Sequence, residues 1–443
     1  MTQGKPLKNL IIFSIPLIIG NFAQQLYSTV DSIIVGKFIG DNALSAVGST
    51  GPVVNIMLIL FVGISVGVSV LVSQYFGARD SDNLSFTIGN CITLTFLSSV
   101  IIAIIGILLA RPLLELLNTP ASIIEWSYQY IVICLIGGVG LAYFNILSGV
   151  LRGLGDSVSA LKYLIVATFV NIILDLVFVI FFNLEVVGVA LATIIAQIIS
   201  AILAYRRIHK LSHLFTLDKH HLMFHKETIF RIFKIGLPAG VAQAIMSVAM
   251  LTTQSLTNSF GEQYIAANII IMRVDAFTVM PIFSIANALT TFAGQNTGAK
   301  NFELLKKGAS QGIKLNLGIS ISCSIIILLF GKSLMSMFTD TQNLIDISYN
   351  YMCVLIVGYV CFSISQSIGG IIRGTGDSVT PMWISIMSTV VRVPIAYFIA
   401  YITISDTFVS GNPISLYISL LIAWGLGALI SLIIYKKNKW LIS

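Results

Sequence analysis

Apolar runs of about 20 residues follow one another along almost the whole chain, and each is long enough for an α-helix to cross a bilayer. Of the 443 residues, 56% are hydrophobic and only 10% are charged, a composition typical of a multi-pass membrane protein. We predict an all-α fold with twelve spans and too little remaining sequence for a soluble catalytic domain. The approximate limits of the spans are 9–36, 52–75, 88–110, 123–147, 159–182, 187–205, 230–258, 264–292, 312–331, 346–368, 381–403 and 414–435.

The 25 Lys and Arg residues are unevenly distributed around these spans. With the N-terminus inside, only Lys37, Arg111 and Lys332 fall on the external side, Arg273 and Arg392 lie within spans, and the remainder are cytoplasmic. By the positive-inside rule we expect a cell-membrane protein with both termini in the cytoplasm. The same basic loops explain the net charge of +7, so the charge does not call for a nucleic-acid partner.

The second half of the chain repeats the first at a nearly constant offset of 221 residues. SQYFGAR at 73–79 aligns with GQNTGAK at 294–300, and VLRGLGDSV at 150–158 aligns with IIRGTGDSV at 371–379. Six spans per repeat is an even number, so both repeats have the same orientation. We therefore expect two parallel six-helix bundles related by a pseudo-two-fold axis along the membrane normal, with a substrate path between them.

This repeat divides the chain into an N-lobe at 1–205, a linker at 206–229 and a C-lobe at 230–443. All five histidines lie in the linker. Some of them have the i,i+4 spacing that can bind a metal on a helix, but we expect a solvated, basic cytoplasmic linker and no metal site other than one for Na⁺. The spaced histidine pairs are His209 with His213 and His221 with His225.

One acid, Asp31, lies well inside the first span. A carboxylate at that depth costs roughly 2.5–3.5 kcal/mol on insertion scales, which makes it a functional candidate. Gln24, Tyr27 and Ser28 share its helix face, because residues three and four apart are neighbours on a helix. The alternative is an Asp near a helix end whose side chain reaches the headgroups.

Other spans bring polar groups to the same depth, roughly 8–11 Å below the outer surface at 1.5 Å per residue. Carboxylate, amide and hydroxyl oxygens suit H⁺ or Na⁺ better than a transition metal, so we predict a cation site. The alternative is a buried hydrogen-bond network that only holds the bundle together. The residues at this depth are Asp31, Tyr130, Asp175 and Thr193; Asn171 and Gln197 lie one turn away, on the helix faces of Asp175 and Thr193.

The second half does not reproduce this acidic site: at the repeat offset, Asp31, Asn171 and Asp175 correspond to Thr252, Arg392 and Ala396. Its only acid within a span is Asp275. We expect Asp275 to form a charge-neutralising pair with Arg392 or Arg273; direct coupling of Asp275 to an ion is the alternative.

The two RGxGDS segments follow the fourth and tenth spans. They match no phosphate-binding motif, so we predict turns in which Arg152 pairs with Asp156 and Arg373 with Asp377. The chain has no ATP-binding motif and no GxSxG nucleophile motif. Transport energy is therefore expected from an ion gradient, and enzymatic activity is not expected.

Two parallel six-helix repeats, with Asp31 fifteen residues after Pro16, resemble the multidrug and toxic compound extrusion (MATE) family, and in particular its DinF-like branch. The resemblance implies that the N-lobe cation site comprises Asp31, Tyr130, Asn171, Asp175 and Thr193, and that Tyr27 and Asn145 are further N-lobe positions. The NorM-like branch has a Glu eight residues after the proline of its seventh helix. Here Met246 follows Pro238 at that spacing, so a NorM-type C-lobe site is not expected.

The resemblance implies a secondary antiporter that exports amphipathic, cationic drugs and dyes in exchange for H⁺ or Na⁺, with no cofactor. Helix 1 would bend at Pro16, because proline lacks an amide donor. The expected partners are small molecules and membrane lipid, and the expected state is a monomer. The expected substrate-chamber residues are Gln24, Tyr27, Asn145, Gln197, Met246 and Met250.

Two alternatives to drug export remain. One is a lipid-linked saccharide flippase of the same wider superfamily, although such proteins often have extra helices or a cationic central cavity. The other is a membrane enzyme acting on lipids, which would need a nucleophile or a metal cluster near the interface. The sequence shows neither.

Overall fold

A computed structural model of the chain describes residues 1–116, 119–120, 122–405 and 408–437. The end of the expected C-lobe, 438–443, lies outside these residues, and so does Lys439, one of the cations assigned to the cytoplasmic side. In the described part, twelve helices are long and apolar enough to cross a membrane. The prediction of an all-α protein with twelve spans is therefore confirmed.

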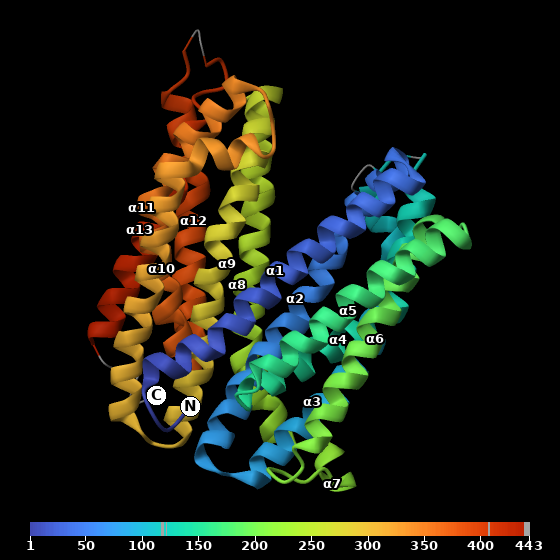
Figure 1. The fold of residues 1–443 in the computed structure, drawn as a ribbon, viewed down its shortest axis with the longest axis vertical. Helices are drawn as coiled ribbons and strands as arrows, with labels where there is room; N and C mark the ends of the chain where they lie inside the picture. Colours follow the sequence, from blue (N-terminus) through green and yellow to red (C-terminus); the bar gives the residue numbers. More distant parts are fainter. Residues whose placement is uncertain (117–118, 121, 406–407, 438–443) are drawn as a thin grey trace. The chain divides into compact units, whose positions relative to one another are not determined.

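Thirteen α-helices and two short π-helical segments make up the described fold (Figure 1). The short helix α7 is the one α-helix among them that is not a candidate span. The elements are α1 Pro6–Ile34, η1 Val35–Ile39, α2 Asp41–Ala78, α3 Ser81–Leu116, α4 Ile124–Gly153, α5 Ser157–Leu176, η2 Val177–Phe181, α6 Glu185–Lys210, α7 Lys219–Leu222, α8 Lys226–Ser259, α9 Glu262–Gly298, α10 Phe302–Ser336, α11 Gln342–Gly374, α12 Val379–Ile402 and α13 Ile414–Lys436.

The chain forms two compact units. Residues Ile15–Gly240 form one, here called the N-lobe unit, and Met1–Ser14 with Val241–Ser443 form the other, the C-lobe unit. These limits differ from those expected from the repeat, because the start of α1 is grouped with the C-lobe unit and the start of α8 with the N-lobe unit. Each change of unit falls two residues from a proline inside a helix, Pro16 in α1 and Pro238 in α8.

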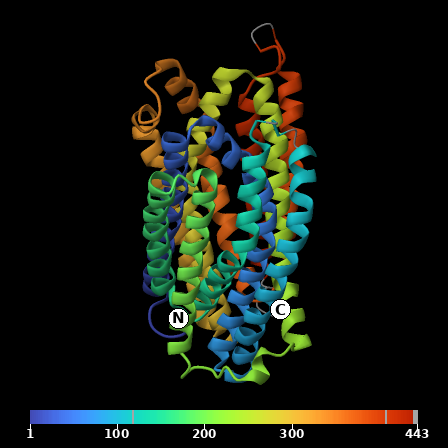
Figure 2. The same ribbon diagram turned by 90° about the vertical axis from the view of Figure 1, so that its right-hand side faces the viewer.

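Both units are built on the same packing pattern. In the N-lobe unit the central helix α4 packs against α2, α3 and α6, and α5 packs against α6. In the C-lobe unit α11 packs in the same way against α9, α10 and α13, and α12 packs against α13. Figure 2 shows the blue-to-green helices of the N-lobe unit running side by side. Each element of the second set follows its counterpart by one repeat, so the sequence repeat is also a structural repeat.

Small residues allow the central helices to approach their neighbours closely. A Cβ atom at Gly149 of α4 would lie 2.7 Å from Ser65 Oγ of α2. At the equivalent place in the other unit, a Cβ atom at Gly370 of α11 would collide with the Ala286 carbonyl oxygen of α9. Packing of small residues is the usual way in which helices associate in a bilayer, where the hydrophobic effect no longer drives association.

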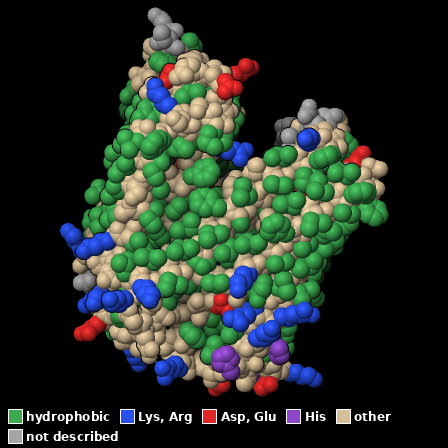
Figure 3. Space-filling view, viewed as in Figure 1, with side chains coloured by type: hydrophobic (Ala, Val, Ile, Leu, Met, Phe, Trp, Pro, Cys, Tyr) green, Lys and Arg blue, Asp and Glu red, His purple; other side chains and the backbone are tan. Residues whose placement is uncertain are grey.

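The outer surfaces of the helices are strongly apolar. Hydrophobic side chains cover the flanks in Figure 3, and Lys and Arg gather near the helix ends. Leu108 is 72% exposed, Phe181 77% and Leu329 71%. In water such surfaces would cause association, whereas lipid tails cover them without cost. The surface therefore agrees with a multi-pass membrane protein.

The segment after α6 is largely exposed, with His209, His213 and His220 open to solvent, but it is also held against α3 near His221 and His225. The Asn90 side chain of α3 donates to the His221 carbonyl oxygen at 3.3 Å and accepts from the His225 amide at 2.9 Å. The Phe86 ring stacks on the His225 ring at 4.7 Å. The histidines therefore help to fasten this segment to α3. Among the described residues there is no group of three or more His, Cys, Asp or Glu side chains placed to hold a metal.

The prediction that Arg152 pairs with Asp156 is wrong. Asp156 caps α5 by accepting from the Ser159 amide at 3.0 Å, and it pairs with Arg207 of α6 at 2.8 Å. Arg152 instead donates to Ser65 Oγ at 3.4 Å. Burial opposes ionisation of Asp156, but the hydrogen bonds from Ser159 and Arg207 outweigh it, so the pKa of this carboxyl group lies below its ordinary value.

The corresponding prediction for the second repeat, that Arg373 pairs with Asp377, is also wrong. Asp377 accepts from the Thr380 amide at 2.9 Å and so caps α12. No ion pair joins it to Arg373 within the described chain. The aspartates of both RGxGDS segments are thus helix caps, a role that stabilises a helix by about 1 kcal/mol.

Candidate functional site

Two acids of the N-lobe unit lie close to π-helical segments. Asp31 is on α1, which becomes the π-helix η1 at Val35. Asp175 is on α5, which becomes η2 at Val177. Both π-helical segments form the C-terminal ends of their spans, with Gly40 following η1 and Phe182 following η2. The sequence does not reveal these segments, because nothing in the local residue pattern separates a π-turn from an α-turn.

The side chains of Asp31 and Asp175 meet. Their carboxyl groups lie at hydrogen-bonding distance from each other, and Asp175 is fully buried. Each carboxyl group also has a buried Oδ1 atom without a hydrogen-bond partner among the described residues. Two carboxylates repel each other at this distance unless they share a proton or bind a cation. The pair therefore fits a site for exchangeable positive charge.

Thr193 of α6 connects this pair to α1. The Tyr27 hydroxyl group donates to Thr193 Oγ1 at 3.1 Å. Asn171, one turn before Asp175 and fully buried, has an amide orientation that satisfies both of its polar groups. In that orientation its nitrogen donates to Asp175 Oδ2 at 3.1 Å and its oxygen accepts from the Thr193 amide at 3.3 Å. These contacts orient Asp175 and restrict the movement of its side chain.

Tyr130 of α4 completes the group. It packs against the cluster of buried side chains that includes Ile34, Val35 and Val179, and its hydroxyl group is within electrostatic reach of Asp31. The structure thus brings together residues of α1, α4, α5 and α6 that the sequence predicts to form one site. They are Asp31, Tyr130, Asn171, Asp175 and Thr193.

Other predicted N-lobe residues are not part of this group. Gln24 is exposed on α1. The Asn145 amide nitrogen donates to the Leu141 carbonyl oxygen of its own helix at 2.9 Å. Gln197 is buried on α6, and its Oε1 atom has no hydrogen-bond partner among the described residues. Pro16 is buried, and α1 continues through it without interruption.

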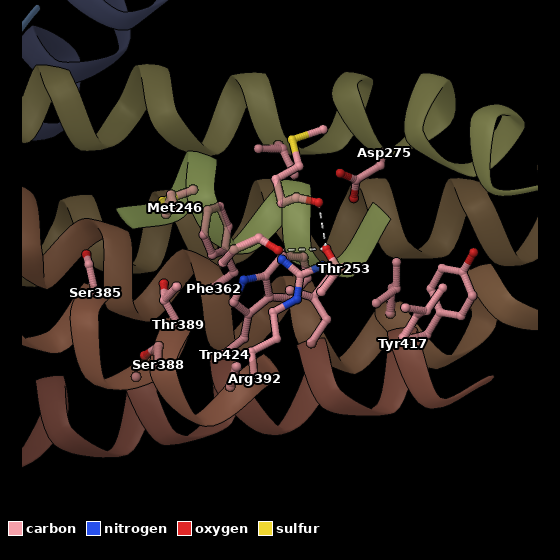
Figure 4. Close-up of a pocket in the computed structure, with 18 of the residues that line it drawn as sticks. Met246, Thr253, Asp275, Phe362, Ser385, Ser388, Thr389, Arg392, Tyr417 and Trp424 are labelled. Carbon is pink, nitrogen blue, oxygen red and sulfur yellow. Dashed lines mark hydrogen bonds between the residues drawn. The ribbon is translucent and has the colours of Figure 1, made fainter. Parts of the chain in front are cut away.

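The C-lobe unit contains a pocket of about 310 Å³ (Figure 4). Met246 and Met250, which sequence analysis proposed for the substrate chamber, both line it. Arg392 of α12 points into the pocket beside Trp424 of α13, and Asp275 of α9 lies at another part of the wall. The pocket therefore combines apolar and aromatic surface with one acid and one base.

The expected charge-neutralising pair is not formed in this pocket. Asp275 accepts a hydrogen bond from the Tyr359 hydroxyl group at 2.7 Å. Asp275 interacts electrostatically with Arg392, but these two side chains form no ion pair in the described chain. Arg273 is exposed and does not line the pocket. The sequence does not mark Tyr359 as a site residue, because one tyrosine in a long apolar span carries no distinguishing pattern.

Comparisons with known proteins agree with this fold. The MatE family model matches residues 16–177 and 238–398. The chain is 29% identical over 429 residues to the probable multidrug resistance protein YoeA of Bacillus subtilis (strain 168), covering 94% of this chain and 92% of that protein. It is also 28% identical over 396 residues to YpnP, a second probable multidrug resistance protein of that organism, covering 89% and 88%.

Among solved structures, "MATE in the bent conformation" is similar, with a TM-score of 0.90, 25% identity and coverage of 98% of this chain and 97% of that one. Twelve spans in two repeated bundles, with acids buried inside one bundle, define a multi-pass membrane transporter rather than an enzyme. The family model matches well over half of the sequence: the chain belongs to the MatE family.

Proposed function

We propose that this chain is a cation-coupled antiporter that exports amphipathic, cationic drugs and dyes. One observation carries the proposal: two carboxyl groups, Asp31 and Asp175, meet inside a helix bundle and keep unpartnered oxygen atoms. An unneutralised acid is costly within a membrane. Binding or release of H⁺ or Na⁺ therefore changes the stability of the surrounding helix arrangement.

Neutralisation at Asp31 acts on α1. With a cation or proton present, the repulsion between Asp31 and Asp175 disappears and the two helices can pack closely. Without it, separation of the helices is favoured. Pro16 offers a place for α1 to bend, because the proline ring removes one backbone hydrogen bond of the helix. We propose that this bend changes the access of the drug to its chamber.

The remaining N-lobe residues position the two acids. Asn171 holds Asp175 through its amide, and Thr193 connects Tyr27 to the same group. The oxygen atoms of the carboxyl, hydroxyl and amide groups around this pair suit H⁺ and Na⁺ alike. We propose that the chain belongs to the DinF-like branch, because the set of Asp31, Tyr130, Asn171, Asp175 and Thr193 resembles that branch's N-lobe pattern. Met246 also stands where the NorM-like branch has a Glu.

The proposed location is the cell membrane, with both termini in the cytoplasm. Support comes from the sequence: the basic residues predicted to be cytoplasmic far outnumber Lys37, Arg111 and Lys332. Reporter proteins fused to the C-terminus test this. We expect green fluorescent protein to be fluorescent there and alkaline phosphatase to be inactive. The reverse result would contradict the orientation.

The decisive experiment is dye export from liposomes containing the purified protein, with an H⁺ or a Na⁺ gradient imposed alone. We expect one or both gradients to drive export, and Asp31→Asn and Asp175→Asn each to reduce it at least about tenfold, since removing the exchangeable charge removes the coupling. Asp346→Asn is the matched control, because this carboxyl group is exposed in the C-lobe unit. Unchanged export in both N-lobe variants would rule out the proposed site.

A further inference from the structure

The C-lobe pocket keeps two opposite charges apart. Asp275 and Arg392 both line the pocket, yet they form no ion pair with each other. Charged groups inside a membrane are rare, and they usually pair with one another or mark a pathway for a substrate. Since these two remain separate, each has capacity for a partner that is not part of the described chain.

Arg392 has the clearest need for a partner. Its Nε atom is buried and makes no hydrogen bond to any described residue. A buried donor without an acceptor costs free energy, and the cost is greater when the group is charged. The guanidinium group presents several N–H donors in one plane, which matches the two oxygens of a carboxylate. An incoming carboxylate would satisfy it.

The carboxyl group of Asp275 is oriented by a neighbour and has a second oxygen atom available for a cationic ligand group. The Tyr359 hydroxyl group donates to its Oδ1 atom at 2.7 Å and so orients the carboxyl group. Among the described residues, Oδ2 receives no hydrogen bond. A cationic or N–H-bearing group in the pocket would find an acceptor there. The pocket wall thus carries a base that could take an anionic group and, at another part, an acid that could take a cationic group.

The remaining lining of the pocket suits a flat, apolar body. Phe362 and Trp424 line the pocket with their rings 4.8 Å apart, and Met246 and Met250 contribute flexible thioether side chains. Aromatic and apolar walls with a few placed polar groups are typical of small-molecule sites. At about 310 Å³ the pocket has the volume of a small organic ligand site.

We propose that the C-lobe pocket binds amphoteric aromatic molecules, whose carboxylate is bound by Arg392 and whose cationic group is bound by Asp275. This inference rests on the proposed export function and narrows its substrate class from cationic to zwitterionic compounds. Arg392 is a binding residue in this scheme, and Tyr359 is a positioning residue that acts through Asp275. Arg273, exposed outside the pocket, has no part in it.

The test uses a cationic aminoxanthene dye with a free carboxylate and the methyl ester of the same dye. The two differ only in the group assigned to Arg392. Binding to the purified full-length protein in detergent is followed by fluorescence polarisation, without any gradient. We expect the wild-type protein to bind the carboxylate dye about tenfold more tightly, the value of one or two hydrogen bonds to a charged group. Equal affinity for both dyes, or no binding of either, would overturn the proposal.

Variants identify the residue responsible. Arg392→Gln should abolish the preference for the carboxylate dye, whereas Arg392→Lys, which keeps the charge but not the planar fork, should retain part of it. Asp275→Asn should weaken both dyes equally, because both carry the xanthene cation. Arg273→Gln is the matched control and should change nothing. If Arg392→Gln and Arg392→Lys both kept the full preference, the assignment would be wrong.

The outcome can be separated from that of the export proposal. Asp31→Asn should lose gradient-driven export and still prefer the carboxylate dye, because Asp31 belongs to the other unit. A chain that exports the dyes but does not distinguish them would overturn only the inference about Arg392. A chain that distinguishes the dyes but exports neither with either gradient would overturn only the antiport proposal.

Discussion

The acidic site of the N-lobe unit and the pocket of the C-lobe unit contain corresponding positions of one repeat, and they differ in charge. Asn171, which orients Asp175 in the first repeat, corresponds to Arg392 in the second. Asp175 itself corresponds to Ala396, which is fully buried. The second repeat gains its acid from a different helix, because Asp275 corresponds to Val54 in the first repeat.

The helix packing that surrounds these positions is shared. The central helices α4 and α11 pack against equivalent neighbours, and glycines permit the same close approach in both units. The shared packing therefore does not determine the chemistry of the site. The difference in charge is consistent with a division of work, in which one unit exchanges a cation and the other recognises an organic molecule.

The strongest way to break this comparison is to give the N-lobe unit the residue of the C-lobe unit. In Asn171→Arg, a permanent guanidinium charge would lie beside Asp175 and replace the exchangeable cation. We expect gradient-driven dye export to fall about hundredfold or more, because arginine does not release its proton at any working pH.

The control for this change is Ser32→Arg, which adds the same side chain at an exposed position of α1 beside Asp31. Size-exclusion chromatography and thermal unfolding establish that each variant is folded. Export by Asn171→Arg at the wild-type rate would mean that charge at this position does not distinguish the two units.

The shared packing can be tested by crowding both central helices. Gly149→Leu and Gly370→Leu should each lower the free energy of unfolding by about 1–3 kcal/mol, because the added side chains meet α2 and α9. Thermal unfolding in detergent measures the effect. Gly138→Leu is the control on α4, since a Cβ atom there would have no other atom within 4 Å. Destabilisation by only one of the two changes would show that the units are packed differently.

A milder change tests the hydrogen bonds of the N-lobe site. Thr193→Ala removes the oxygen that accepts from Tyr27, and we expect the affinity for the coupling cation to fall about threefold to tenfold, the value of one neutral hydrogen bond. Gradient-driven export at varied cation concentration measures it, and Thr193→Ser should restore the affinity. The corresponding C-lobe residue is already apolar, so Ile414→Ala should leave the cation affinity unchanged. A similar loss in both variants would contradict the difference between the units.

The smallest expected effect concerns the helix caps. Asp156 pairs with Arg207, whereas Asp377 has no such partner within the described chain. Asp156→Asn keeps a capping side chain but loses the charge, so it should cost about 0.5 kcal/mol at pH 7. Because the pKa of Asp156 is lowered by folding, this contribution is present at neutral pH and declines as the pH falls below the ordinary value of 3.8.

Thermal unfolding of the wild type and of both variants between pH 7 and pH 3 measures the contribution of the cap charge. Asp377→Asn should have the smaller effect at neutral pH. An equal effect of the two substitutions would mean that the contact with Arg207 adds nothing measurable.

Some of these features were readable from the sequence, and for a physical reason. The number and position of the spans follow from hydropathy, which reports burial in lipid directly. The meeting of Asp31, Asn171 and Asp175 was foreseeable, because helices of known direction place their residues at calculable depths. The helix periodicity gives the face on which each side chain lies, and the limits of the span give its depth in the membrane.

Other features depend on rotations and contacts that hydropathy does not report. Asp156 pairs with Arg207 rather than Arg152, because the end of α6 lies beside the start of α5. Phe86 and Asn90 fasten the histidine segment through contacts distant in sequence. The expected ion pair of Asp275 is absent because Arg392, although on a facing wall, does not approach it closely enough.

The start of α1 belongs to the C-lobe unit and the start of α8 to the N-lobe unit, which limits how the chain can be divided into stable fragments. A cleavage between α6 and α7 would separate the two sequence repeats, but each fragment would lack a segment that belongs to its own unit: Met1–Ser14 for one and the start of α8, up to Gly240, for the other. Neither fragment should be stable when it is produced alone. Co-expression should restore both, so gene fission at this loop would create two mutually dependent genes rather than two autonomous half-transporters.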